Sequence, residues 1–233
     1  MPLPMIISHK HKFIFVKTVK TAGTSIEVFL SQHCGPDDVL TPIFPAIENH
    51  QPRNYEGRVH PMSEILRLPF GPVSAWRHVL SQRQRFYRHM PAWLVCVRVP
   101  ATIWNSYFKF CVDRNPWDKV LSHYHMTAHR QGGQLSLDQY LLRGKLPINY
   151  PRYTDSFGSR IIVDRVIRYE NLSEELAEIF ARLKIPFDGT LGIRAKGEYR
   201  ADRRPYQAVF TSKQRQLVQR IFAREIELHG YHF

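Results

Sequence analysis

The segment Phe13–Glu27 constrains the fold more than any other part of this 233-residue chain. It opens with the continuous apolar run Phe13–Val16, which is bracketed by lysines and is typical of a strand buried on both faces. Small residues at 22–23 predict a tight turn, and an expected helix follows. Thr24 and Glu27 have the spacing of a capping box at the start of that helix. A buried strand that feeds a capped helix through a short turn predicts an α/β fold.

The rest of the chain alternates in the same way between short apolar runs and helical periods. Further strands are expected at Trp93–Val99, Tyr107–Val112 and Val166–Tyr169. Helices are expected after Asn171, on a face that runs from Leu172 to Leu183, and near the end, from a cap at Thr211 or Ser212 to Leu228. The proline-rich stretch 34–75 predicts a long irregular connection, and no shift in composition marks a second domain. We therefore expect one α/β domain over residues 1–233.

Composition narrows the class of protein. Lysine and arginine total 33 against 20 acidic residues, which gives a formal charge of +13. No run approaches the ~18 apolar residues of a membrane helix, and no secretory signal is recognisable, so we expect a soluble, cytoplasmic protein. Three cysteines without a CxxC pair indicate neither a disulfide framework nor a zinc site. The charge predicts an anionic partner, which composition leaves open between nucleic acid, a phosphorylated small molecule and an acidic polymer.

The turn after the first strand has the components of an anion site. The start of a helix presents unpaired N–H groups and the positive end of the helix dipole, which suit a phosphate or a sulfate. Lys20 adds a point charge, and Thr21, Thr24 and Ser25 add hydroxyl donors. An ordinary capped turn is the simpler alternative. The segment is not a Walker A loop, because that pattern places its lysine directly after the second glycine and Lys20 precedes Gly23.

A second candidate anion site combines an arginine and a serine eight residues apart. Asn115 is placed to cap a helix, Pro116 suits the first helical position, and Asp118 lies in the first turn. Arg114, just before that helix, can grip a phosphate with two parallel hydrogen bonds. Ser122, two turns on, can add a hydroxyl contact. The alternative is an arginine in a surface ion pair and a serine that faces solvent.

Together and in this order, the two motifs resemble those of the sulfotransferase superfamily that uses 3'-phosphoadenosine-5'-phosphosulfate (PAPS). Lys20–Ser25, KTAGTS, resembles the 5'-phosphosulfate loop, commonly PKTGGTS or PKTAGTS. Arg114–Tyr124 resembles the 3'-phosphate motif RNPxDRxxSxY. Val166–Leu172 and Ala223–Tyr231 resemble the strand-to-helix element after the core and the closing helix of carbohydrate-type members. The likeness is weak across residues 34–100.

The resemblance implies a P-loop-like central parallel sheet flanked by α-helices. It implies an enzyme that transfers the sulfuryl group of PAPS to a hydroxyl acceptor, with a glycan or another small molecule as the expected partner and no nucleic acid, integral membrane segment or metal ion. The residues implied in 5'-phosphosulfate binding are Lys20, Thr21, Ala22, Gly23, Thr24 and Ser25. Arg114 and Ser122 are implied in 3'-phosphate binding, and Lys20 in stabilising the bridging oxygen as it leaves.

The chain departs from the family pattern at three positions near these motifs. Val19 replaces a proline, which should matter little. Asp113 brings a carboxylate next to Arg114, where it is expected to weaken phosphate binding. Lys119 replaces an arginine, a tolerable change on the expected helix surface. An apparent insertion covers about 71–101.

A second arginine–serine pair repeats the spacing of eight residues. Arg98 and Ser106 have this spacing, but they lack counterparts of the Asn115, Asp118 and Tyr124 that accompany Arg114. We therefore prefer Arg114.

A sulfuryl transfer needs a base for the acceptor hydroxyl, and twelve histidines compete for that role. In carbohydrate-type members resembling this chain, a histidine lies between the two motifs and before a short helix. His60, followed by Pro61, matches that place best. A loop histidine bonded to backbone is the simpler interpretation. The other candidates are Glu48, His50 and His78.

Two further classes of function remain as alternatives. A nucleotide-dependent kinase or phosphotransferase would use a similar anion cradle, although it would normally carry the Walker lysine that is missing here. A basic nucleic-acid-binding protein is compatible with the charge, although the basic residues are dispersed rather than gathered in a stripe with aromatics. A late group of basic residues fits either a flap over a bound anion or a solvated loop: Arg194, Lys196, Arg200, Arg203 and Arg204.

Overall fold

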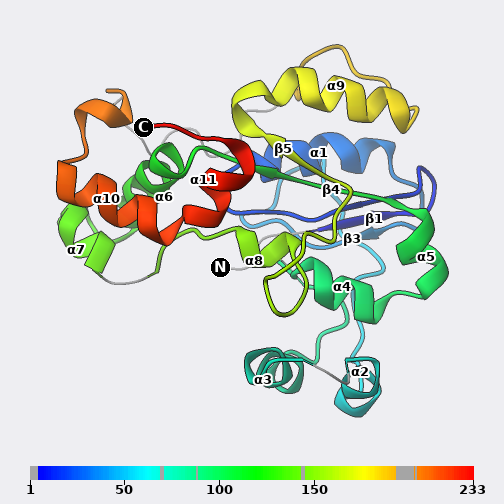
Figure 1. Cartoon of the computed structure of the whole chain (residues 1–233). Coiled ribbons are helices and arrows are strands. Elements are labelled where there is room, and N and C mark those ends of the chain that lie inside the picture. Colours follow the sequence, from blue (N-terminus) through cyan, green and yellow to red (C-terminus); the bar gives the residue numbers. More distant parts are fainter. Residues whose placement is uncertain (1–4, 69–70, 88, 143–144, 193–201, 203) are drawn as a thin grey trace.

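A single mixed β-sheet organises the chain (Figure 1). The structure, a computed structural model, describes residues 5–68, 71–87, 89–142, 145–192, 202 and 204–233. Within them, five strands lie in the order β3-β1-β2-β4-β5. Their bounds are Ile6–Ser8 (β1), Phe13–Phe15 (β2), Val39–Leu40 (β3), Phe108–Asp113 (β4) and Arg165–Arg168 (β5). The strands β2, β4 and β5 are parallel, whereas β1 runs antiparallel to both of its neighbours.

The expected α/β class is confirmed, and the sheet is mixed rather than wholly parallel. Strands predicted near residues 13–16, 107–112 and 166–169 are present. A short hairpin-like return puts β1 antiparallel beside β2, and β3 extends that edge. Only the half of the sheet formed by β2, β4 and β5 has the parallel arrangement that crossover helices produce.

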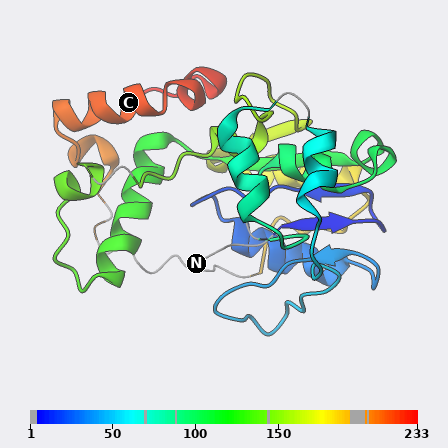
Figure 2. The same ribbon diagram turned by 90° about the horizontal axis from the view of Figure 1, so that it is seen from below.

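Helices cover both faces of the sheet and gather at one end of it (Figures 1 and 2). The bounds of the first six are Gly23–His33 (α1), Pro61–Arg67 (α2), Val73–Ser81 (α3), Ala92–Arg98 (α4), Ala101–Ser106 (α5) and Pro116–Arg130 (α6). The remaining ones are Leu137–Leu142 (α7), Tyr150–Tyr153 (α8), Leu172–Arg182 (α9), Ser212–Ile221 (α10) and Ala223–His229 (α11). None of these helices, which cover the described part of the chain, is long and apolar enough to serve as a membrane span.

The pleat of β2 divides the core between the two faces. Phe13 and Phe15 point to the face covered by α1 and α9, where they join Phe180. Ile14 points to the opposite face, where it joins Leu94 of α4. A third apolar cluster is built from α6, α7, α10 and α11, beyond the end of the sheet. The residues that follow β2 contact the segments just before α6 and α8, through Arg114 and Asn149.

Two sequence-based predictions of local structure are wrong. The segment Trp93–Val99, expected as a strand, lies in helix α4 up to Arg98, with Val99 as its C-cap. Pro91 sets the extended backbone that precedes the first turn of this helix, and Pro100 follows its end. A short apolar run has the same composition in a buried helix as in a buried strand, so periodicity alone does not separate them. The expected last helix is two helices, since the chain breaks at Phe222. Its cap is Thr211, which forms a capping box with Gln214.

The proline-rich connection contains short elements rather than being wholly irregular. It includes β3, α2 and the start of α3, and α2 packs against α3 and α4. In the apparent insertion about 71–101, Val79 and Leu94 lie in the core beneath the sheet. The insertion itself, and the single domain over 1–233, stay predictions.

Candidate functional site

The loop between β2 and α1 adopts a backbone suited to binding an anion. Lys20 and Ala22 both have left-handed conformations, with φ of 62° and 58°. Such alternation turns successive N–H groups toward a common hollow. The first hydrogen bond of α1 runs from Ile26 N to Ala22 O at 3.2 Å, and no side chain caps the helix. The first turn also carries no acidic residue, so the positive end of α1 faces this loop.

The predicted capping box of Thr24 and Glu27 is wrong. Helix α1 begins two residues earlier than that capping box implies, with Ala22 as its N-cap. Both side chains accept hydrogen bonds from Lys17 instead. Lys17 is 2% exposed, and its Nζ donates to Thr24 Oγ1 at 3.0 Å and to Glu27 Oε2 at 2.5 Å. Because Lys17 neutralises Glu27, the buried carboxylate does not cancel the positive end of the helix.

Gly23 allows the loop to close over this buried lysine. A Cβ at Gly23 would lie 2.7 Å from Cγ and 2.9 Å from Cε of Lys17, which is closer than real Cβ contacts. The Thr21 hydroxyl lies 2.8 Å from the Thr18 hydroxyl, so it bonds within the loop, as the Thr24 hydroxyl does. Ser25 is buried in the first turn. The loop therefore offers an anion mainly its main-chain N–H groups and the Lys20 ammonium.

Helix α6 begins as the sequence predicts. The Asn115 side chain accepts from Trp117 N at 3.1 Å and from Asp118 N at 3.4 Å, and Pro116 occupies the first helical position. Arg114 forms an ion pair with Asp118 and lies 4.2 Å over the ring of Tyr169. These contacts fix the guanidinium at the start of α6.

The two predicted anion motifs lie side by side. Arg114 Nη1 donates to the main-chain oxygen of Lys20 at 3.3 Å, although the two residues are 94 positions apart. The Lys20 Nζ reaches Met126 Sδ at 3.9 Å. Asp118, Ser122 and Met126 follow one another at intervals of four, so they share one face of α6. Ser122 therefore lies between the two points where Lys20 and Arg114 meet that helix.

The surroundings of this face are positively charged. Burial, together with the nearby charges of Lys20 and Arg130, lowers the pKa of His123 to about 4. The ring of His123 bonds to the Tyr140 hydroxyl at 2.6 Å. His123 is thus neutral near pH 7, and the positive charge next to it comes from Lys20 and Arg130.

Asp113 and Lys119 lie in a buried cluster, which corrects two expectations. Lys119 is fully buried rather than on a helix surface, and its Nζ donates to Asp113 Oδ1 at 2.7 Å and to Glu225 Oε2 at 2.8 Å. Burial by itself lowers the pKa of Lys119, but the two carboxylates reverse this and raise it. Asp113 also accepts from the Tyr153 hydroxyl at 2.8 Å and from Asn149 Nδ2 at 3.1 Å. Its negative charge is therefore compensated in the interior rather than left uncompensated beside Arg114.

The second arginine–serine pair serves the structure. Arg98 forms a buried ion pair with Glu64 and donates to the main-chain oxygens of Gln82 and Gln84. Ser106 donates to the Thr102 main-chain oxygen at 2.6 Å. The Arg98 guanidinium is thereby tied to its own neighbourhood.

His60, the predicted base, is exposed and immediately precedes α2. Among the other candidates, Glu48 is exposed, His50 is buried with its Nε2 at 2.9 Å from Thr41 O, and His78 bonds to the Tyr87 hydroxyl. In the described part of the chain, none of the contacts we find joins His60 to the loop at 17–25.

Sequence reasoning missed His89, whose Nδ1 lies 3.1 Å from Lys17 O. No motif surrounds His89, so the sequence carried no signal for its position.

Most of the late basic group lies outside the described residues. This applies to Arg194, Lys196, Arg200 and Arg203. Arg204 is described and forms an ion pair with Asp202 at 2.8 Å. The flap and the solvated loop stay open alternatives for this segment.

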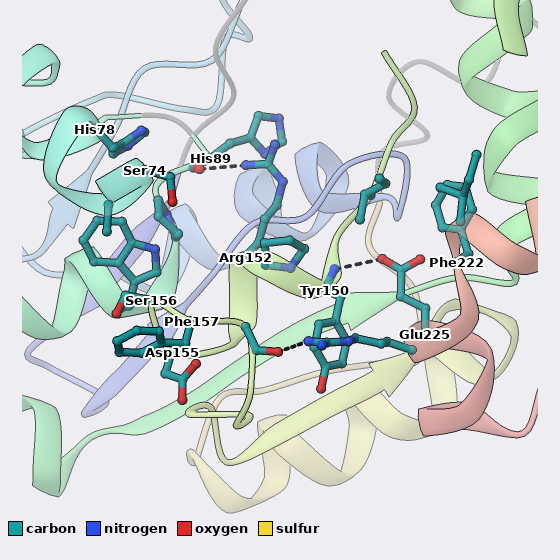
Figure 3. Close-up of a pocket in the computed structure, with 18 residues that line it drawn as sticks. Ser74, His78, His89, Tyr150, Arg152, Asp155, Ser156, Phe157, Phe222 and Glu225 are labelled. Atoms are coloured by element: carbon teal, nitrogen blue, oxygen red, sulfur yellow. Dashed lines mark hydrogen bonds between the residues drawn. The ribbon is translucent and has the colours of Figure 1, made fainter. Parts of the chain in front are cut away.

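A cavity of about 640 Å³ lies next to the loop (Figure 3). Side chains from α3, from the segment 89–93, from α8 and the turn after it, and from α10 and α11 line it. The polar side chains in its wall include His78, His89, Arg152 and Glu225. In the described residues no group of three or more histidine, cysteine or acidic side chains is arranged to hold a metal ion.

About half of the chain is similar in sequence to an archaeal protein. No protein-family model matches it. A protein of Archaeoglobus fulgidus is 32% identical over 117 residues, which are 48% of this chain and 98% of the archaeal protein. The two chains belong to one family. The archaeal protein is itself uncharacterized, so membership of this family brings no activity with it.

A solved structure can be aligned with most of this chain. It is the crystal structure of a sulfotransferase from Alicyclobacillus acidocaldarius, which aligns over 91% of this chain and 92% of that one, with 17% identity and a TM-score of 0.38. A TM-score of this size does not establish a common fold. The evidence for the architecture and for the site is the strand register and the side-chain contacts of this chain.

Proposed function

We propose that this protein is a PAPS-dependent sulfotransferase that transfers the sulfuryl group to a hydroxyl acceptor. The observation that supports it best is the meeting of two anion-binding motifs, 94 residues apart, through the bond between Arg114 and Lys20. The donor carries two separate anionic groups, a 5'-phosphosulfate and a 3'-phosphate. A site with two adjacent anion cradles suits such a ligand better than one with a single cradle.

The residues fit the two groups in different ways. The N–H groups at the start of α1 and the Lys20 ammonium suit the 5'-phosphosulfate, because the loop is left-handed at Lys20 and Ala22 and the helix has no side-chain cap. Arg114 and Ser122 suit the 3'-phosphate. Asp118 and Tyr169 hold the guanidinium in place, which reduces the entropy lost when it binds a phosphate.

The transfer requires one proton acceptor and one stabilised leaving group. The acceptor oxygen bonds to sulfur while the bond from sulfur to the bridging oxygen breaks, and the electron pair stays with the 5'-phosphate. Lys20 is placed to compensate that developing charge. A histidine takes the hydroxyl proton. The family resemblance assigns that role to His60, which is exposed at the start of α2.

One contact also bears on the alternative of a kinase. In Walker-type loops a serine or threonine hydroxyl at the helix start holds Mg²⁺. Here the Thr24 hydroxyl accepts from the Lys17 ammonium at 3.0 Å. The Thr24 hydroxyl is thus already engaged by a cation of the chain itself, and this favours a sulfuryl donor over ATP–Mg²⁺.

Thermal shift measurements with three ligands test the proposal. We expect 3',5'-adenosine diphosphate (3',5'-ADP), the desulfated product, to raise the melting temperature, and ATP–Mg²⁺ and an oligonucleotide to have little effect. The Arg114→Gln variant should lose most of the stabilisation by 3',5'-ADP. The matched control is Arg220→Gln, which removes an exposed guanidinium from α10 and should respond as the wild type does. Stabilisation by ATP–Mg²⁺ or by the oligonucleotide alone would contradict the proposal and favour that ligand's class.

A further inference from the structure

The wall of this cavity, drawn in Figure 3, is joined to the residues just before Lys20 by two sets of hydrogen bonds. His89, in its wall, contacts Lys17 O through Nδ1. Asn149, next to the lining residue Tyr150, accepts from Val19 N at 2.8 Å and donates to Val19 O at 3.1 Å. The wall of the cavity thus holds the residues that directly precede Lys20. A ligand in the cavity would lie beside the end of the loop where the sulfuryl group is proposed to bind.

The contact to Lys17 fixes the proton on the His89 ring. A main-chain carbonyl only accepts hydrogen bonds, so Nδ1 of His89 must be the donor in this contact. In the neutral ring the lone pair then lies on Nε2, the nitrogen that a general base uses. His89 has a left-handed backbone, with φ of 55°. Such a conformation is uncommon outside glycine, asparagine, aspartate and histidine, and often occurs at functional sites.

Arg152 gives the cavity an uncompensated positive charge. Its Nη1 donates to the His89 main-chain oxygen at 2.8 Å, so the two side chains lie next to one another in the wall (Figure 3). Its Nε is buried without a hydrogen-bond partner, and burial lowers the pKa of the guanidinium. The described residues supply no carboxylate to it. An unpaired buried donor of this kind is costly and is best satisfied by an anionic ligand.

The acidic groups in the same wall are already engaged. Asp155 accepts from the N–H and the hydroxyl of Ser159 at 2.9 and 2.8 Å. Glu225 binds Lys119 and accepts from the N–H groups of Asn149 and Tyr150. Neither carboxylate offsets Arg152, so the cavity favours a ligand that brings its own negative charge.

We infer that the cavity binds the acceptor, that the acceptor is a hydroxylated carboxylate, and that His89 is the catalytic base. This inference rests on the proposed function. The acceptor carboxylate binds Arg152, and its hydroxyl bonds to Nε2 of His89. Nε2 takes the hydroxyl proton as the oxygen bonds to the sulfur of PAPS, the bond from sulfur to the 5'-phosphate oxygen breaks, and the electron pair leaves with 3',5'-ADP.

Calorimetric titrations test the class of acceptor. The protein is first saturated with 3',5'-ADP and then titrated with glucuronate or glucose, which differ only at C6, where the first has a carboxylate and the second a hydroxymethyl group. We expect glucuronate to bind at least about tenfold more tightly, as one charged hydrogen-bonded contact implies. Arg152→Gln should abolish this preference, and Arg220→Gln, an exposed matched control, should keep it.

Three results of these titrations separate the possible failures. Equal binding of the two sugars to the wild type, or an unchanged preference in Arg152→Gln, would overturn the assignment of a carboxylate acceptor. Failure of 3',5'-ADP to bind the wild type would instead remove the proposed function, and this inference with it.

Turnover tests the base. Transfer of labelled sulfuryl from PAPS to glucuronate is compared for the wild type, His89→Asn and His60→Asn. Asparagine tolerates the left-handed backbone and can keep the bond to Lys17 O, but it lacks Nε2. We expect His89→Asn to lose about 100-fold or more in kcat with unchanged affinity for 3',5'-ADP, and to lose far more than His60→Asn does. The reverse pattern would return the role to His60, and glucuronate that binds but receives no sulfuryl group would not be an acceptor.

Discussion

Replacing Lys119 by methionine would remove the cation from the buried cluster that supports the site. Lys119 is fully buried and lies 2.7 Å from Asp113 and 2.8 Å from Glu225. Asp113 in turn bonds to Asn149, which holds Val19 of the loop. Methionine keeps the length and the apolar stem of the side chain, so the variant isolates the loss of charge.

The expected cost follows from the two contacts that disappear. Each hydrogen bond between charged groups contributes about 1.5–3 kcal/mol, and breaking a buried ion pair by removing one partner costs about 3–5 kcal/mol. Lys119→Met should therefore lower the free energy of unfolding by about 3–5 kcal/mol at pH 8. This is a large part of the total free energy of unfolding of a domain, which is about 5–15 kcal/mol. It should also weaken binding of 3',5'-ADP, because the cluster anchors both Arg114 and the loop.

The cost should depend on pH with a definite sign. Burial raises the pKa of Glu225 to about 7, and the charge of Asp113 acts in the same direction. A carboxyl whose pKa is higher in the folded state than in the unfolded state destabilises the fold as pH rises from the unfolded value through the folded one. Without Lys119 that pKa rises further, so Lys119→Met should be closer to the wild type at pH 6 than at pH 8.

Urea unfolding at pH 6 and pH 8 measures both effects. The exposed Lys213→Met variant of α10 is the matched control and should differ little from the wild type. The double variant Lys119→Met/Glu225→Gln removes one of the two stranded charges and should recover about 1–2 kcal/mol, which keeps the test readable if the single variant folds poorly. A loss below about 1 kcal/mol, or one that is the same at both pH values, would refute the reasoning.

Three smaller predictions concern the loop and the helix that faces it. Gly23→Ala places a Cβ against the Lys17 side chain, so it should cost about 1–3 kcal/mol in urea unfolding and weaken 3',5'-ADP binding; unchanged stability would show that Lys17 can move aside. Asn115→Ala removes the cap of α6 and should cost about 1 kcal/mol by the same measurement, whereas a neutral effect would mean that water replaces the cap. Asn149→Ala removes the two hydrogen bonds to the main chain of Val19 and should weaken 3',5'-ADP binding about tenfold by calorimetry. Unchanged affinity would show that the loop keeps its conformation without these bonds.

Local patterns were sufficient to predict the parts of the site that depend on near neighbours. The continuous apolar run at 13–16 and the small residues after it predict β2, the turn and α1, and all three are present. The cap by Asn115 and the first-turn Asp118 are confirmed, because a capping residue acts on amides two and three positions away. The resemblance between short motifs also pointed to Arg114 and Lys20, which the fold brings into contact.

Contacts between distant residues were beyond such patterns. Lys119 was expected on a helix surface because the local sequence gives no sign of its buried partner Glu225, which is 106 residues away. The predicted capping box was wrong for a similar reason. Glu27 binds the buried Lys17 rather than the main-chain N–H that its spacing from Thr24 suggests. His89 lies in a segment without regular structure, and its place beside Lys17 depends on how the loops pack.

The 3'-phosphate provides the most direct test of the central claim that two anion cradles bind one donor. Calorimetry would compare the affinities of 3',5'-ADP and 5'-AMP for the wild type and for Arg114→Gln. Our expectation is that 3',5'-ADP binds the wild type at least about tenfold more tightly than 5'-AMP, as one charge-assisted phosphate contact implies, and that Arg114→Gln reduces this ratio to about one. Equal affinities in the wild type, or a ratio that survives the loss of Arg114, would contradict it.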